Sequence, residues 1–381
     1  MSNRHDGGRS SSRTTTDLAP IRRSVEVEYW VIDRDGRLTT PGDLVDLPGA
    51  ETEFVAPMVE IKTTPCETAA ELREELLGRI KTVLDRADDR GLGLVPLSTP
   101  IAASSIEDRD SERTRIQDRV VGERFEYVRH CAGTHIHVEQ QPGHEVDQVN
   151  ALTALDPALA LVNSSPYFDG KPLARGARSL LYRRMAYDEL PHQGQLWPYV
   201  DSVEEWAKRL ESRYREFKNE AAISGLDRET VEAEFPPESA VWTPVKLRAA
   251  FSTVEWRSPD TALPSQILRL ADDVVGIVER AVTDGPRIEG AAGHLMDDDM
   301  VLPEFDAVEG YVEAAIRDGL DSEELRAYLD RMGFDVDAYE PLSAELDGIG
   351  GCSIADARDL RLECAERLRA DVHGARSIHA D

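Results

Sequence analysis

Alternation of apolar and polar positions predicts strands in several separate parts of the chain. The run SVEVEYWVID, residues 24–33, is rich in β-branched and aromatic side chains and stops at a turn pair, Asp35-Gly36. The run GTHIHVE, residues 133–139, alternates in the same way. Further extended segments are predicted at residues 53–63, 94–98 and 245–256, the last as a strand pair or one bent strand.

Helical periodicity fills much of the remaining sequence. Predicted helices cover residues 68–90, 112–130, 146–162, 203–222, 263–282, 307–318, 322–332 and 355–370. The segment NSSPYFDGKPLARGARS, residues 163–179, is rich in Gly, Pro, Ser and Asn and too long for a simple connection, so a functional loop is predicted there. Separated strands and helices that do not alternate with them predict an α+β fold with a largely antiparallel sheet.

The same pattern divides the chain into three parts. Residues 1–20 are polar, lack the apolar stretch of a secretory signal, and are expected to be disordered. Residues 21–290 hold the strands and the candidate chemistry and are predicted to form a catalytic domain. Residues 291–381 are acidic and mainly helical, and are predicted to pack on that domain as an extension or to provide a homodimer surface.

Composition concerns the environment more than the chemistry. The chain of 381 residues has 73 Asp and Glu against 44 Lys and Arg, a net charge of −29 that argues against nucleic-acid binding. Only six of the basic residues are Lys. Scarce lysine with surplus carboxylate suits a protein hydrated in concentrated salt, so we expect the cytoplasm of an extreme halophile. The alternative is an ordinary acidic protein with a local bias in composition.

The sequence lacks the patterns of a membrane protein, a zinc knuckle and a disulfide-rich protein. No apolar run approaches the roughly 18 to 20 residues that cross a bilayer, so no membrane association is expected. The four cysteines have no close paired spacing, which indicates neither a zinc knuckle nor a disulfide framework.

Glutamates on the predicted strands are the first candidates for chemistry. Glu26 and Glu28 share one strand face about 7 Å apart, where two like charges cost on the order of 2 to 3 kcal/mol at an effective dielectric of 20 but under about 1 kcal/mol in water. Burial therefore decides between a solvated face and a cation site. Glu60 and Glu255 lie between apolar neighbours, and Arg257 shares the face of Glu255, which predicts a metal beside an anion or, alternatively, an internal salt bridge.

His135 and His137 form an H-x-H pair on another strand. The pair is compatible with a zinc site, a phosphate contact or two partly buried imidazoles, and no further zinc ligands stand at conventional spacing. Glutamate oxygens with an imidazole suit Mg²⁺ or Mn²⁺ better. No G-x-x-x-x-G-K-[ST], no G-x-G-x-x-G after a strand and no G-x-S-x-G occurs, so a nucleotide would have to bind through metals and arginines.

Several strings taken in order resemble a known family. SVEVEYWVID, MVEIKTTPCET, GTHIHV, NSSPYFDG followed by GARS, and STVEWRSPD run from residue 24 to 260 and together resemble the glutamate-cysteine ligase type 2 family, including its carboxylate-amine ligase branch. The resemblance implies the glutamine synthetase and guanido kinase-like fold, in which a concave sheet face binds two or three Mg²⁺ ions around ATP and helices pack on the other side. The metal ligands that it implies are Glu26, Glu28, Glu60, His135 and Glu255. The catalytic residues implied with them are Arg257 and Arg178, which would also contact the nucleotide phosphates or a substrate carboxylate, and His137.

The family resemblance also implies a reaction. ATP would phosphorylate the side-chain carboxylate of glutamate, and the amine of cysteine would then displace phosphate to give γ-glutamylcysteine. No enzyme nucleophile is needed, in agreement with the missing motifs. The loop GKPLARGARS is more basic than is usual in the family, and the tail after Asp297 has no counterpart, which leaves the amine and the subunit contacts open.

Three alternatives stay open at this point. The first is a carboxylate-amine ligase of the same mechanism with a different amine. The second is a metal-dependent hydrolase that uses His135 and His137 with zinc and needs no ATP. The third is a non-catalytic acidic binding protein with solvated, scattered glutamates.

Overall fold

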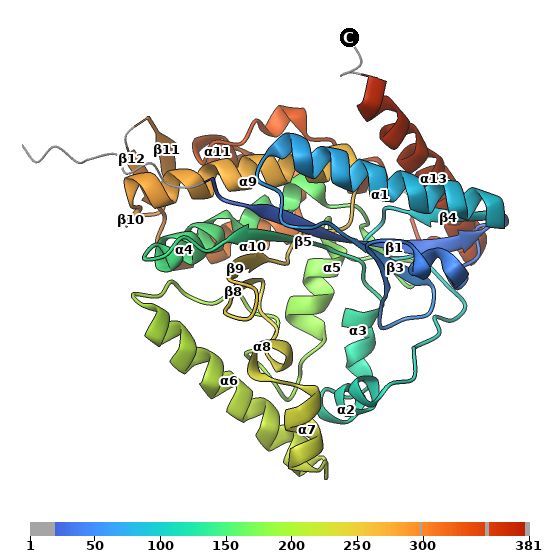
Figure 1. Ribbon diagram of the computed structural model, residues 1–381, viewed down its shortest axis with the longest axis horizontal. Coiled ribbons are helices and arrows are strands. Elements are labelled where there is room, and N and C mark those ends of the chain that lie inside the picture. The colour runs from blue at the N-terminus through green and yellow to red at the C-terminus, as the bar shows by residue number, and fades with distance from the viewer. Residues whose placement is uncertain (1–19, 298, 347–349, 378–381) are drawn as a thin grey trace, which may run out of the picture.

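A seven-stranded sheet lies at the centre of the computed structural model, with helices on both of its sides (Figure 1). The structure describes residues 20–297, 299–346 and 350–377, so the predicted polar tail lies outside the described residues except for its last position. No helix in these ranges is long and apolar enough to cross a membrane.

Antiparallel pairing joins every neighbouring pair of strands in this sheet. The strands are β1 (Arg23–Asp33), β2 (Ala50–Thr52), β3 (Met58–Lys62), β4 (Leu92–Val95), β5 (Thr134–Glu139), β8 (Val245–Arg248) and β9 (Thr253–Trp256). Their order across the sheet is β2-β3-β1-β5-β9-β8, and β4 pairs with the last part of β1. The predicted α+β class with an antiparallel sheet is confirmed, and segment 245–256 is a strand pair.

Two long helices, α1 (Ala69–Arg90) and α9 (Pro264–Asp284), cover one face of the sheet (Figure 1). Thr68 accepts a hydrogen bond from the Glu71 backbone N–H while the Glu71 side chain accepts one from Thr68, so a capping box starts α1. The alternation of β1 sends Val25, Val27 and Tyr29 into the core beneath these helices, where each is fully buried. The intervening glutamates of β1 must therefore project from the opposite face.

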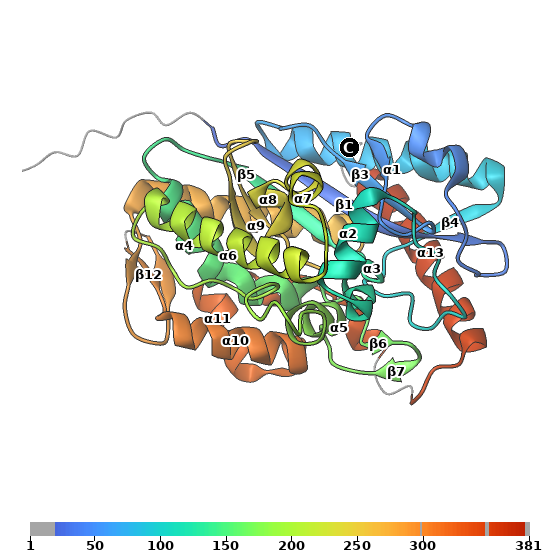
Figure 2. The same cartoon turned by 90° about the horizontal axis from the view of Figure 1, so that it is seen from below.

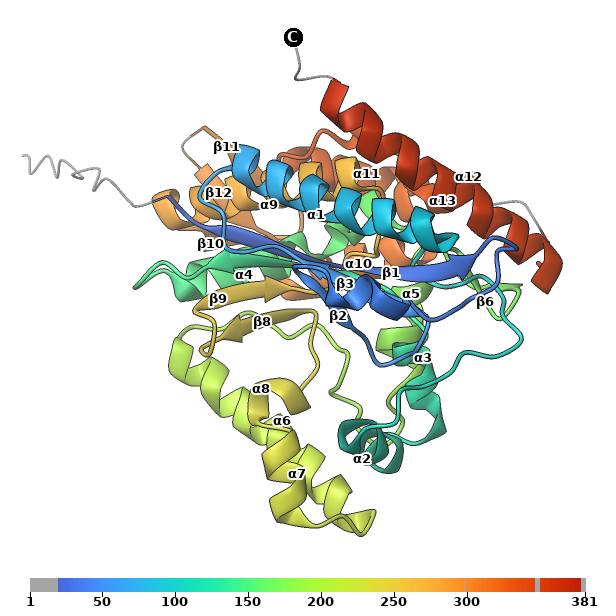
Figure 3. The ribbon, with the colours of Figure 1, turned by 45° about the vertical axis from the view of Figure 1, so that its right-hand side comes forward.

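Other helices lie on that opposite side, as the view from below and the turned view show (Figures 2 and 3). They are α2 (Glu112–Val120), α3 (Glu126–Arg129), α5 (Ala177–Leu180), α6 (Val203–Ile223), α7 (Arg228–Glu234) and α8 (Pro237–Ala240). The prediction of one helix over residues 112–130 was wrong, because Gly122 takes a left-handed φ of +84° and separates α2 from α3. The predicted loop 163–179 holds a small hairpin, β6 (Tyr167–Phe168) and β7 (Lys171–Pro172), and runs into α5.

The C-terminal region is part of the same packed interior. Its elements are β10 (Arg287–Ile288), β11 (His294–Met296), β12 (Asp299–Leu302), α10 (Phe305–Arg317), α11 (Glu323–Arg331), α12 (Leu342–Glu345) and α13 (Ile354–Ser377). The earlier helix α4 (Glu145–Leu155) contacts α10. Ala357 and Cys364 of α13 pack in one cluster with Trp30 and Ile32 of β1. The three strands β10 to β12 form one small sheet across residue 290, and the domain boundary predicted there stays a prediction.

Candidate active site

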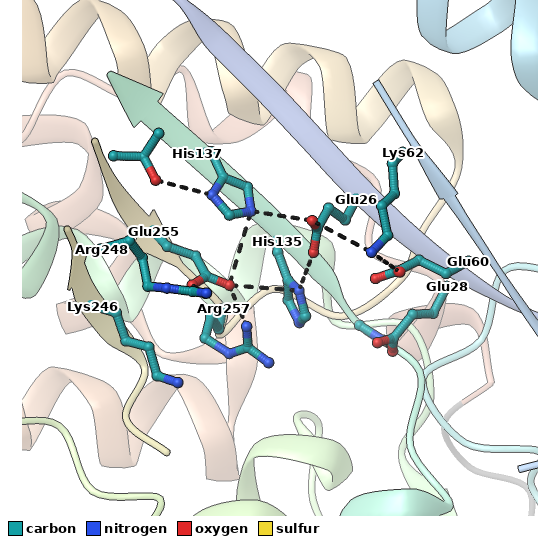
Figure 4. Close-up of polar contacts among 12 residues, drawn as sticks. Glu26, Glu28, Glu60, Lys62, His135, His137, Lys246, Arg248, Glu255 and Arg257 are labelled. Atoms are coloured by element: carbon teal, nitrogen blue, oxygen red, sulfur yellow. Dashed lines mark hydrogen bonds and ion pairs between the residues drawn. The ribbon is translucent and has the colours of Figure 1, made fainter. Parts of the chain in front are cut away.

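Strand register places polar side chains in three rows across the sheet, on the face that α1 and α9 leave free (Figure 4). Directly paired residues of antiparallel strands project from the same face. The rows, named here by position, are the acidic row Glu51–Glu60–Glu28, the middle row Lys62–Glu26–His135 and the outer row His137–Glu255–Lys246. They join β2, β3, β1, β5, β9 and β8, and they bring Glu26 and Glu255, more than 200 positions apart in the sequence, into one group.

Candidate ligand atoms converge in three overlapping sets. Within each set, one atom per residue lies within 4.8 Å of the others. The first set is Glu26–His137–Glu255, the second is Glu26–Glu60–His135 and the third is Glu28–Glu53–Glu60. All five residues predicted as metal ligands belong to these sets, and their role as ligands stays a prediction.

Glu53 is the member of these sets that the sequence analysis missed. It follows β2 directly, and its carboxylate faces Glu28 and Glu60. Burial, followed by the charges of those two neighbours, raises its pKa well above the ordinary value. Glu51 and Glu53 stand two positions apart, which was a usable signal, but only the turn from β2 into β3 brings Glu53 to the cluster.

The electrostatics of the cluster favour bound positive charge. Glu60 is only 3% exposed, and burial together with the charges of Glu26 and Glu28 raises its pKa to about 8 despite the nearby Lys62. Glu255 is fully buried; its burial acts to raise the pKa, but the positive charge of Arg257 and the neighbouring histidines outweigh it and hold the pKa well below the ordinary value. Carboxylates this close are stable neighbours only with positive charge between them.

The donor set fits a hard divalent ion. His137 Nε2 is buried without a hydrogen-bond partner among the described residues, and it lies 3.6 Å from Glu26 Oε1 and 3.9 Å from Glu255 Oε1. Ligands about 2.1 Å from an octahedral ion lie about 3 Å from their neighbours and about 4 Å from the ligand opposite, so these separations suit a shared ion. The surplus of carboxylate oxygens over imidazoles favours Mg²⁺ or Mn²⁺ over zinc.

The two predicted arginines occupy different positions. Arg257 is half-buried, forms an ion pair with Glu255 and lines the adjoining pocket. Arg178 donates hydrogen bonds to the carbonyl oxygens of Arg257 at 3.2 Å and Ser258 at 3.0 Å, so it holds the backbone that carries Arg257. Gly133 makes this possible, because a Cβ there would lie 2.2 Å from Arg178 Nη2.

A buried ion pair supports β9 from below. Asp156 is fully buried and lies 2.7 Å from Nη2 of Arg183, whose side chain is only 3% exposed. Asp156 Oδ1 accepts a hydrogen bond from Trp256 Nε1 at 2.9 Å and another from the hydroxyl of Ser258. Trp256 lies between Glu255 and Arg257, so this network fixes the backbone from which both site residues project.

A pocket of about 730 Å³, including its open mouth, adjoins the three sets. Glu28, Glu53 and His135 line it on the side of the cluster, and Arg178 and Arg257 line it as well. Aromatic side chains, among them Phe125, Tyr182 and Trp242, form much of the remaining wall. A small molecule could place a charged group beside the cluster and an apolar or aromatic group against the aromatic wall.

The sequence matches the glutamate-cysteine ligase family 2 over residues 11–347. A candidate glutamate-cysteine ligase 2 of Corynebacterium jeikeium is 27% identical over 351 residues, which cover 85% of this chain and 78% of that protein. A candidate glutamate-cysteine ligase 2-1 of Frankia casuarinae is 29% identical over 221 residues, covering 57% of this chain and 52% of that protein.

The fold has a counterpart among solved structures. The crystal structure of a bifunctional glutathione synthetase from Pasteurella multocida aligns with a TM-score of 0.59 at 15% identity, over 92% of this chain and 52% of that chain. The chain thus spans about half of that larger protein, and the likeness concerns the fold. Because the family match extends over most of the sequence, the chain belongs to the glutamate-cysteine ligase family 2 and is an ATP-dependent carboxylate-amine ligase.

Proposed function

We propose that the protein is a glutamate-cysteine ligase that forms γ-glutamylcysteine through a γ-glutamyl phosphate. The observation that carries the proposal is the convergence of Glu26, Glu60 and Glu255 from three strands on one sheet face, beside a pocket that contains arginines. Family membership supports the reaction class. The choice of glutamate and cysteine rests on the names of the relatives.

In this mechanism the first and third sets would hold divalent ions that neutralise the phosphate charge of ATP during phosphoryl transfer. Arg257 faces the pocket and can stabilise the negative charge that develops on the transferring group, while Arg178 positions Arg257 through its backbone. His137 presents its unpartnered Nε2 to Glu26 and Glu255, so we assign it to the first set. The amine then attacks the acyl phosphate carbonyl, and inorganic phosphate leaves.

The second candidate is the same reaction with a larger amine. Phe125, Tyr182 and Trp242 line the pocket, and such a wall offers more apolar contact than the side chain of cysteine uses. An amino acid or amine with an apolar or aromatic group would use that contact. The two candidates share the cluster and differ only in the molecule that attacks.

Phosphate release from ATP tests the proposal. The assay contains Mg²⁺, glutamate and a panel of amines in low and in molar KCl, with the product identified by mass spectrometry. Release that depends on cysteine and yields γ-glutamylcysteine is the expected result, while release with another amine selects the second candidate. Arg257→Lys is the matched variant, because it keeps the charge but cannot form a bidentate contact, and strongly reduced turnover is expected. ATP-independent, zinc-dependent hydrolysis would contradict both candidates.

A further inference from the structure

One lysine stands inside the carboxylate cluster. Lys62 Nζ lies 2.6 Å from Glu60 Oε2, 3.0 Å from Glu51 Oε2 and 3.8 Å from Glu26 Oε1. It is the direct cross-strand partner of Glu26, and Glu60 is two residues before it on the same strand face. The ammonium therefore connects the acidic row to the middle row, as Figure 4 shows.

This position coincides with one of the three candidate ligand sets. The second set consists of Glu26, Glu60 and His135, and two of its three members already contact the Lys62 ammonium. A divalent ion held by the same carboxylates would lie within a few ångströms of that ammonium, where two positive charges repel strongly. One cation, and not two, fits between Glu26 and Glu60.

The residue type suits this role. Only six of the 44 basic residues in the chain are Lys, and Lys62 is one of the few of them that form ion pairs among the described residues. An ammonium is a compact point charge, comparable to a bound cation, whereas guanidinium is a broad planar fork. Lys246, in the outer row, is different, because its Nζ donates to the carbonyl oxygen of Glu238 at 3.0 Å and it touches no complete ligand set.

We propose that the Lys62 ammonium replaces a divalent ion in the second set, so that ions bind only to the first and third sets. The inference rests on the proposed metal-binding role of the cluster. Lys62 then acts as a fixed counter-charge between two ion positions and sets their number. It is a positioning residue, since it acts through Glu26 and Glu60.

The number of bound Mn²⁺ ions tests this inference. Free Mn²⁺ is measured by electron paramagnetic resonance during titration of the purified protein with Mn²⁺ alone. The wild type is expected to bind two ions and Lys62→Gln three, while Lys62→Arg, which keeps the charge, is expected to bind two. Lys81→Gln is the matched control and should bind two. Lys81 is similarly exposed, and among the described residues its ion pair is with Asp85 on α1, away from the cluster.

The dependence of thermal unfolding on Mn²⁺ separates this role of Lys62 from that of a structural salt bridge. Without metal, Lys62→Gln should melt about 2 to 4 °C below Lys81→Gln, because three carboxylates lose their shared cation. Saturating Mn²⁺ should remove this difference, whereas a lost structural salt bridge would leave it unchanged.

The outcomes separate this inference from the proposed function. Two ions in both the wild type and Lys62→Gln, or three in the wild type, would overturn the role of Lys62 and leave the metal cluster intact. If the wild type binds no Mn²⁺, the carboxylate cluster is not a metal site, and both the proposed metal-binding role and this inference are wrong.

Discussion

Asn in place of Asp156 would test whether the buried network beneath β9 holds the site residues in place. The substitution keeps an oxygen that can accept from Trp256 but removes the charge that lies 2.7 Å from Arg183. Arg183 would then remain as a buried and unpaired cation, because its side chain is only 3% exposed. Breaking a buried pair from one side in this way costs about 3 to 5 kcal/mol.

The assay is denaturant unfolding followed by tryptophan fluorescence, with Arg183→Met and the double variant as controls. Because the double variant leaves no unpaired charge, its free energy of unfolding should exceed that of Asp156→Asn by about 1 to 3 kcal/mol. Strictly additive losses would refute the reasoning, since they would mean that the two side chains do not interact. Turnover should also fall in Asp156→Asn under conditions where the variant is fully folded. Asp156 holds Trp256 by a hydrogen bond, and Trp256 lies between the site residues Glu255 and Arg257 in the chain.

Three further predictions concern the site and its surroundings. Gly133→Ala should reduce kcat/KM by roughly tenfold or more, because the new Cβ would displace Arg178, and an unchanged value would show that Arg178 has room to move. Glu255→Gln should reduce ATP-dependent phosphate release by on the order of 10²-fold with an intact circular dichroism spectrum; wild-type turnover would remove Glu255 from the site. Burial raises the pKa of Asp260 from 3.8 to about 6, so the folded protein takes up this proton before the unfolded chain does. As the pH falls from about 6 to 4, the wild type should gain about 2 kcal/mol of stability relative to Asp260→Asn, and a difference that does not change with pH would contradict the assignment.

Local patterns were enough to predict the central strands and the long helices. The alternation in residues 24–33 marks β1 because one face is buried under α1 while the other carries Glu26 and Glu28. The predicted helix 68–90 has its start and end within one residue of α1, since a capping threonine and Gly91 define both ends chemically. Such signals are carried by a few neighbouring residues.

Features that depend on the tertiary fold were not predictable in the same way. The break at Gly122 depends on a left-handed backbone that a single glycine permits but does not require. Glu53 joins the cluster only because the chain turns between β2 and β3. The hydrogen bonds that Arg178 donates to backbone carbonyls depend on the space left by Gly133, which no local pattern signals, and the predicted contact of Arg178 with an anion stays a prediction.

A crystal structure of the protein with Mn²⁺ and ADP, with anomalous difference maps, tests the central claim most directly. The account predicts Mn²⁺ peaks about 2.2 Å from oxygens of Glu26 and Glu255 in the first set and from oxygens of Glu28 and Glu53 in the third. Maps without an anomalous peak among these carboxylates, with the nucleotide bound elsewhere, would contradict it.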